Sequence, residues 1–264
     1  MLATSTSTMS KLLGMGVPSK CVTLPVPAES SSAVTLKRAS LLMPQTTKKI
    51  RSAISQPPHL AATVPNLTAS NYHDGWTYQG GAFELGFNVS WTMLQLTLAN
   101  FKNLASAKGV PQERRQQLIE AVDSMWTAFR QVPLKEFSHL KGGLADYFYD
   151  WIDHPSYDEY WKKLCIEEHH SGITVPALNI GGWYDIFLGG TIRNFLGMRE
   201  NGDGEEVRKA QKLIIGPWQH AGRGTSLAGS HYFGLAADAL ALDLDGIHLR
   251  WFDYWLKGVD NGIL

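Results

Sequence analysis

Two short apolar runs that end in glycine decide the fold: residues 175–185 read VPALNIGGWYD and residues 212–220 read KLIIGPWQH. Each apolar run has the length of a buried β-strand, and we expect the strands to stop at Gly181 and at Gly216. Residues 190–200, between the runs, have a helical pattern. A strand, a helix and a second strand form a βαβ unit, whose strands are parallel. The sequence therefore predicts an α/β fold with a parallel sheet flanked by helices.

A titratable side chain follows each predicted strand. Asp185 ends the loop GGWYD, and His220 ends the loop GPWQH. The carboxyl ends of parallel strands meet at one edge of a sheet, where open α/β sheets place catalytic groups. A carboxylate beside an imidazole forms the acid and base of a nucleophilic hydrolase. We therefore expect a catalytic pair, although an aspartate here could simply cap a helix and a histidine could simply be exposed.

The two loops resemble those of the cocaine-esterase-like (CocE/NonD) and X-prolyl dipeptidyl-peptidase family of α/β-hydrolases. That family carries its catalytic aspartate in a G-W-Y-D loop and its catalytic histidine in a G-P-W-x-H loop, and Asp185 and His220 match these positions. Similar stretches are SQPPHL at 55–60, YHDGWTYQGG at 72–81 and RWFDYWLKG at 250–258. The resemblance implies a serine hydrolase that cleaves an ester, or an amide bond after proline, through an acyl-enzyme.

The resemblance also implies a domain organisation: a partial α/β-hydrolase core with an inserted helical cap. We expect the match to the core to begin in residues 51–65, the cap to occupy 66–170 and the C-terminal part of the core to occupy 171–264. Residues 1–50 are expected to be an unrelated or disordered segment. The last residues, NGIL, resemble a turn followed by the start of a strand. We therefore expect a fragment that lacks the C-terminal β-domain of the family.

Two further helices are expected from periodicity, one over 111–131 and one over 243–257. The second should end at Gly258. The side chains that should face inward from these two helices are Leu118, Val122, Met125 and Phe129 in the first, and Leu249, Phe252 and Leu256 in the second.

The nucleophile is absent from the place where the family has it. The order in this fold is serine, acid, histidine, with the serine in a G-x-S-x-G elbow. Counting back along the resemblance puts the serine near Met43, where Pro44 lacks the N–H that the oxyanion hole requires. No G-x-S-x-G occurs in the sequence, and Ser226 follows His220 in the wrong order. We therefore expect impaired hydrolysis, or alternatively a non-catalytic remnant that binds a small ligand or a partner.

The resemblance implies a substrate pocket near Trp76 and Phe187, although Phe187 could equally be a core residue. Asp74 and Glu84 lie among aromatic residues and could shape such a pocket, or could equally accept loop hydrogen bonds. The run EEHH at 167–170 lacks the H-E-x-x-H spacing of a metal site, and adjacent histidines on a helix diverge. We expect neither a metal nor a cofactor.

Composition excludes several classes of protein. The 24 Lys and Arg residues balance the 24 Asp and Glu residues, so charge gives no reason to expect nucleic acid or a membrane as partner. Two cysteines cannot form a disulfide scaffold or a structural zinc site. The expected partner is a small ester or peptide substrate, and the oligomeric state is left open.

The first 65 residues differ from the rest, since Glu29 is their only acid while lysine, arginine, serine and threonine recur. This composition fits an organelle transit peptide, and it also fits a tail unrelated to the domain. A continuous apolar segment of the kind found in secretory signals is absent, which favours the cytoplasm over export and leaves the compartment open.

Overall fold

The computed structural model describes residues 53–96, 111–141, 145–220 and 224–264. The segment 1–50, including the expected position of the nucleophile, lies outside the described residues. Among the described residues, no helix combines the length and the apolar character needed to cross a bilayer.

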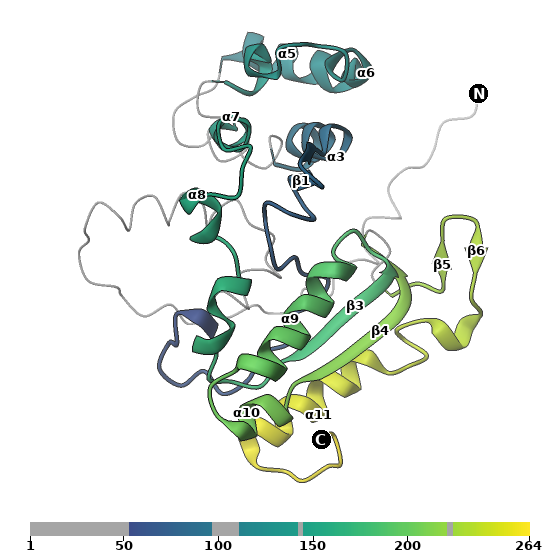
Figure 1. The fold of residues 1–264 in the computed structure, drawn as a ribbon. Helices are drawn as coiled ribbons and strands as arrows, with labels where there is room; N and C mark the ends of the chain where they lie inside the picture. The colour runs from purple at the N-terminus through teal and green to yellow at the C-terminus, as the bar shows by residue number, and fades with distance from the viewer. Residues whose placement is uncertain (1–52, 97–110, 142–144, 221–223) are drawn as a thin grey trace, which may run out of the picture. The chain divides into compact units, whose positions relative to one another are not determined.

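A parallel sheet forms where the sequence predicts it. Strand β3 (Leu178–Tyr184) pairs in parallel with β4 (Lys212–Gln219) (Figure 1). On the other side of β3, residues 63–66 form isolated parallel bridges, and the N–H of Ile180 donates to the carbonyl of Pro65 at 2.9 Å. This third segment was not predicted, because a stretch this short that contains a proline has no strand periodicity.

The prediction that both strands stop at their glycines is wrong. In register, Gly182 lies opposite Gly216, and the pairing continues until Tyr184 lies opposite Gln219. The glycines permit this close approach, because a Cβ atom on Gly182 would overlap the carbonyl oxygen of Trp218. The pairing of β3 with β4 therefore requires glycine at position 182, and it does not end at that residue.

Helices cover the two faces of the sheet (Figure 1). Successive residues of a strand point to opposite faces. Ile180 packs in a cluster with Trp251 of α11 (Leu244–Lys257), whereas a Cβ on the next residue, Gly181, would lie 3.1 Å from Thr191 of α9 (Leu188–Asn201). The predicted helices at 190–200 and 243–257 are thus confirmed, and α9 is followed by a short helix, α10 (Glu205–Lys209).

The buried face of α11 differs from the predicted one. Leu249 and Leu256 are 66% and 63% exposed, so their predicted inward orientation is wrong. Trp251 is fully buried, and Trp255, one turn later, packs against the same cluster. The indoles remove more apolar surface from water than the leucines would, which selects this face. The predicted end at Gly258 is confirmed by its left-handed backbone, with φ of 68°.

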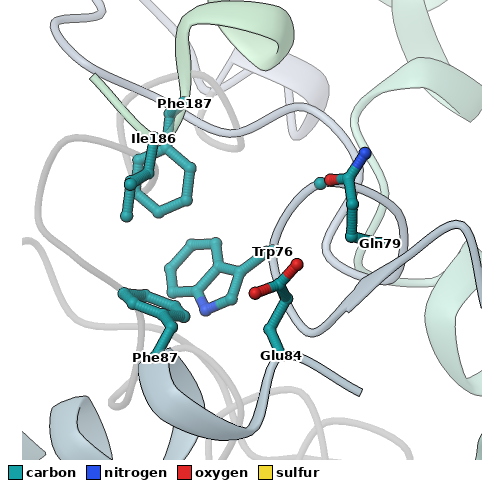
Figure 2. A pocket seen from close by; sticks show the side chains of 7 residues that line it. Trp76, Gln79, Glu84, Phe87, Ile186 and Phe187 are labelled. Carbon is teal, nitrogen blue, oxygen red and sulfur yellow. The ribbon is translucent and has the colours of Figure 1, made fainter. Parts of the chain in front are cut away.

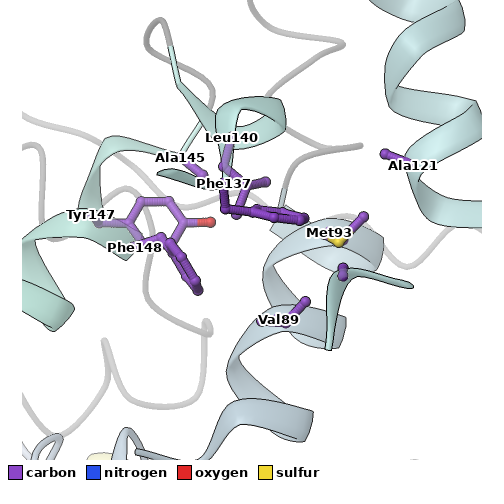
Figure 3. Packing of buried hydrophobic residues seen from close by; sticks show 9 residues of the cluster. Val89, Met93, Ala121, Phe137, Leu140, Ala145, Tyr147 and Phe148 are labelled. Atoms are coloured by element: carbon purple, nitrogen blue, oxygen red, sulfur yellow. The ribbon is translucent and has the colours of Figure 1, made fainter. Parts of the chain in front are cut away.

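The predicted helix over 111–131 is divided at Ser124 into α5 (Gln112–Asp123) and α6 (Met125–Ala128). The Ser124 hydroxyl donates to the carbonyl of Glu120 at 2.7 Å, a bond that competes with continued helix formation. The predicted face nevertheless packs: Leu118 is buried, and the other three residues contact a cluster around Phe148 (Figure 3). That cluster is supplied by residues from several segments, namely Val89, Met93, Ala121, Ala128, Phe137, Leu140, Ala145, Tyr147 and Phe148.

The remaining elements are short. The helices are α3 (Leu85–Trp91), α7 (Asp146–Asp153) and α8 (Glu159–Lys162), a π-helical turn at Thr92–Leu96, and 3₁₀ turns at Leu134–Glu136, Ser138–Leu140, Glu167–Gly172 and Leu235–Ala237. Two small hairpins are formed by β1 (Tyr78–Gln79) with β2 (Ala82–Phe83), and by β5 (Leu227–Ala228) with β6 (His231–Tyr232).

The close approach at Gly182 leads to a stability prediction. Gly182→Ala should lower the free energy of unfolding by about 1–3 kcal/mol, because the added methyl group forces the strands apart. Gly86→Ala is the matched control: a Cβ there meets no atom within 4 Å, and alanine is the better helix former. Urea denaturation of both variants measures the difference, and equal stabilities would contradict the role assigned to Gly182.

Burial of His170 leads to a prediction about pH. Burial lowers the pKa of this imidazole from its usual value of 6.5, despite a hydrogen bond with Asn194. The folded protein therefore binds that proton less readily than the unfolded chain, so stability should fall as the pH falls through about 6.5.

Urea midpoints at about pH 7.5 and about pH 5.5 should show this loss in the wild type and a smaller loss in His170→Gln. The control is His59→Asn, which removes an exposed histidine at a left-handed position (φ 68°) that asparagine tolerates. The same loss in His170→Gln as in the wild type would contradict the assignment.

Candidate active site

Asp185 and His220 are hydrogen-bonded to each other. Oδ2 of Asp185, just beyond β3, lies 2.8 Å from Nδ1 of His220, just beyond β4. The two residues are 35 positions apart in the sequence. The parallel pairing of their strands brings them to the same edge of the sheet, as the sequence predicts. Their catalytic role stays a prediction at this point.

The carboxylate of Asp185 is fixed on both of its oxygens. While Oδ2 faces His220, Oδ1 accepts a hydrogen bond from the backbone N–H of Phe187 at 2.6 Å, at the start of α9. The side chain has no exposed surface, so the orientation of the carboxylate is determined by these two contacts. Asp185 is therefore the partner of His220, whereas the helix-cap interpretation does not hold, because the N-cap of α9 is Phe187.

The imidazole of His220 is held at one nitrogen and open at the other. Its side chain is 43% exposed, in contrast to its buried partner. A carboxylate at Nδ1 favours the tautomer with the proton on that nitrogen, which leaves Nε2 with a free lone pair. Among the residues that the structure describes, Nε2 has no hydrogen-bond partner. The arrangement can therefore accept a proton at Nε2 from a nearby hydroxyl group.

A cavity with aromatic walls lies beside Phe187, which contacts His220. The ring of Phe187 meets the His220 ring edge-on at 5.2 Å between centroids, and it lies 4.6 Å from the indole of Trp76. Both aromatic residues line a cavity of about 200 Å³ (Figure 2). Phe187 also belongs to a buried cluster, so the core role that the sequence left open applies as well. The full lining consists of Gly75, Trp76, Gln79, Glu84, Phe87, Ile186 and Phe187.

Sequence reasoning missed part of this lining. Phe87 and Ile186 lie in no motif, and Gln79, although part of the stretch 72–81, was not assigned to the pocket; the position of Ile186 directly after Asp185 could also have indicated a place near the site. Ser226, the imperfect elbow serine, is buried beside the β5–β6 hairpin, and its hydroxyl forms no hydrogen bond with His220.

The EEHH run does not form a metal site in the described part of the chain. Glu167 pairs with Arg193 at 2.6 Å, and His170 turns inward to contact Asn194. No group of three or more His, Cys, Asp or Glu side chains suited to a metal occurs among the described residues.

Comparison with known proteins gives the family. Residues 45–222, more than half of the sequence and including both residues of the pair, match the X-Pro dipeptidyl-peptidase (S15) family. The chain belongs to this family. Its members are serine hydrolases that act as esterases or X-Pro peptidases. The resemblance identified from the two loops is thereby confirmed.

Individual relatives agree with this placement. Cocaine esterase from Rhodococcus sp. (strain MB1 Bresler) is 28% identical over 215 residues, which cover 81% of this chain and 36% of that protein. An aminopeptidase from a marine sediment archaeon, Thaumarchaeota archaeon, has a similar structure, with 19% identity and a TM-score of 0.55 over 81% of this chain and 33% of that one.

A CocE/NonD family hydrolase from Staphylococcus aureus aligns with 17% identity and a TM-score of 0.46, over 83% of this chain and 28% of that one. The chain therefore spans about a third of the length of the relatives it matches. The structural likeness to the archaeal protein, together with the β3–α9–β4 unit, confirms the predicted partial α/β-hydrolase core.

The contact between the two side chains predicts a tautomer. In the wild type at neutral pH, the His220 ring should carry its proton on Nδ1. Asp185→Asn places a donor amide at that nitrogen, because the amide oxygen remains paired with the Phe187 N–H, and the proton should move to Nε2. Nitrogen-15 NMR of histidine-labelled protein distinguishes the two forms. Asp74→Asn, at an exposed carboxylate, should leave the spectrum of His220 unchanged, whereas an unchanged tautomer in Asp185→Asn would contradict the assignment.

Proposed function

We propose that Asp185 and His220 are the acid and the general base of a serine-hydrolase reaction on a small ester or X-Pro peptide. The observation that carries this proposal is the 2.8 Å contact between the buried carboxylate and Nδ1 of a partly exposed imidazole. Membership of the S15 family supports the reaction class. Both esters and X-Pro peptides are included as substrates, because hydrolysis of either bond passes through an acyl-enzyme.

The geometry gives each residue a step. Nε2 of His220 removes the proton of the nucleophile as its oxygen bonds to the substrate carbonyl carbon. Asp185 stabilises the imidazolium that forms and prevents the ring from rotating. His220 then returns the proton to the leaving alcohol or amine, and activates water in the same way to release the acid. The cavity beside Phe187 would hold one end of the substrate during both steps.

We further propose that the 264-residue chain performs this reaction weakly. The sequence contains no G-x-S-x-G elbow, and counting back along the resemblance puts the nucleophile near Met43, followed by Pro44, which lacks the N–H that the oxyanion hole requires. Covalent catalysis and the oxyanion hole each contribute orders of magnitude in rate, whereas a histidine base alone contributes far less. In this proposal, Asp185 and His220 are retained without the serine nucleophile that the histidine would activate.

A second candidate function is the binding of a small ligand without turnover. The cavity of about 200 Å³ favours it, because its aromatic walls come from described residues and do not depend on a nucleophile. In this alternative the protein would be a non-catalytic relative of the hydrolases.

Labelling with a fluorophosphonate, read by intact mass, tests the proposal. The reagent modifies only serines whose hydroxyl is activated by a base. We expect no adduct on the folded wild-type chain, and slow hydrolysis of 4-nitrophenyl acetate that becomes slower still in His220→Ala, because the variant lacks the base.

A complete hydrolase of the same family serves as the positive control for the reagent. A single adduct on the wild type that is lost in His220→Ala would contradict the weak-activity proposal, and it would show that a serine elsewhere in the chain is activated. An adduct retained in His220→Ala would contradict the role of His220 as base.

A further inference from the structure

The imidazole of His220 has the features of a nucleophile as well as those of a base. Its Nε2 atom has no hydrogen-bond partner among the residues that the structure describes, and its side chain is 43% exposed. The lone pair that accepts a proton at this nitrogen is the same lone pair that can attack a carbonyl carbon. Histidine is among the side chains that form covalent intermediates in enzymes. Both uses of the lone pair are therefore open to Nε2.

Two contacts fix the orientation of this ring. The carboxylate of Asp185 faces Nδ1 at 2.8 Å, and the ring of Phe187 lies 5.2 Å away between centroids, with the two planes at 87°. Asp185 has no exposed side-chain surface and is itself held by the N–H of Phe187. The imidazole is thus restrained at Nδ1 and on one side, while Nε2 can meet a substrate. A nucleophile that is oriented in advance loses less entropy on reaching the transition state.

The buried carboxylate also suits the charge that such an attack creates. By accepting the proton of Nδ1, the carboxylate keeps the lone pair on Nε2. When Nε2 bonds to an acyl carbon, the ring becomes a positively charged acyl-imidazolium, and Asp185 lies at its opposite nitrogen, where the negative charge stabilises this cation. The ring does not have to lose a proton for the new bond to form, so the step needs no second base.

We propose that Nε2 of His220 forms a covalent acyl-histidine with activated acyl compounds. In the first step, Nε2 bonds to the carbonyl carbon of the substrate, and the bond from that carbon to the leaving oxygen or sulfur breaks, so that the leaving group departs with the electron pair. In the second step, water bonds to the same carbon, Nε2 departs with its electron pair, and a proton of the water passes to solvent. The products are the acid, the leaving group and the free imidazole.

The leaving group determines the class of substrate. It competes with imidazole for departure from the tetrahedral intermediate, and only a weakly basic group leaves readily enough. Aryl esters, thioesters and acyl phosphates carry such groups, whereas alkyl esters and peptides do not. The inference goes beyond the proposed function, because it gives His220 a bond to the substrate and does not require a serine.

A second carboxylate–imidazole contact shows what distinguishes His220. Nδ1 of His154 lies 2.6 Å from Oδ2 of Asp158. The side chain of Asp158 is 44% exposed, so water competes for its charge, whereas that of Asp185 is fully buried. The ring of His154 is also stacked on Tyr160, at 4.4 Å between centroids and with planes 5° apart. His154 is therefore a matched control, since it is a carboxylate-paired imidazole whose partner is not buried.

Acylation of the full chain by 4-nitrophenyl trimethylacetate tests the proposal, because the bulky acyl group slows the attack of water on the intermediate. Absorbance follows the release of 4-nitrophenol, and peptide mapping by mass spectrometry locates the acyl group. We expect the acyl group on His220, and acylation at least about tenfold faster in the wild type than in Asp185→Asn, in which the proton moves to Nε2 and removes its lone pair. His154→Asn should react as the wild type does.

Circular dichroism verifies that each variant is folded. A folded wild type without an acyl group on His220, an acyl group on a serine in its place, or equal rates in the wild type and Asp185→Asn would each overturn the proposal. Ethyl trimethylacetate, which has an alkoxide leaving group, should not acylate the protein, and acylation by this ester would contradict the substrate class.

The outcome is separable from that of the proposed function. An acyl group on His220 together with no fluorophosphonate adduct supports the histidine nucleophile in a chain with weak serine-hydrolase activity. A fluorophosphonate adduct on a serine that depends on His220, without an acyl group on His220 itself, overturns the nucleophile while the role of His220 as general base stands.

Discussion

Parallel pairing of β3 with β4 is the constraint on which the site depends. It aligns the ends of two strands whose loops carry Asp185 and His220, and it brings the carboxylate and the imidazole to 2.8 Å although 35 residues separate them. The pairing requires glycine at 182, because any side chain there would meet the neighbouring backbone. The contact between Asp185 and His220 thus follows from backbone hydrogen bonding between the strands and from the absence of a side chain at Gly182.

The second requirement is the junction between the sheet and the segment that carries Trp76. Gly190 of α9 lies so close to residues 69–70 that a Cβ atom would be 2.7 Å from the nitrogen of Ser70. This contact anchors the chain shortly before Trp76, whose indole then packs on Phe187. Phe187 itself is fixed by its N–H bond to Asp185. The Asp185 carboxylate therefore contacts both the His220 ring and the backbone of Phe187, whose ring lies between His220 and the cavity.

The contact between Asp185 and His220 is formed entirely by described residues. Asp185 obtains its contacts from His220 and from the start of α9, both of which lie in the described part of the chain. The orientation of His220 and the formation of the cavity are accordingly properties of described residues between 63 and 220. Binding and base orientation can therefore be measured separately from turnover in this protein.

Local pattern alone was sufficient for the strand–helix–strand unit, for the end of α11 at Gly258 and for the proximity of Asp185 to His220, because strand length, glycine and loop position are encoded in short segments. Tertiary structure alone decided the rest. The strands continue past their glycines, because the absence of a side chain leaves room for the neighbouring backbone. Helix α11 buries Trp251 in place of Leu249, because the indole covers more apolar surface against the sheet. The sequence places Glu84 among aromatic residues, but the cavity that it lines forms only when packing brings two separate segments together.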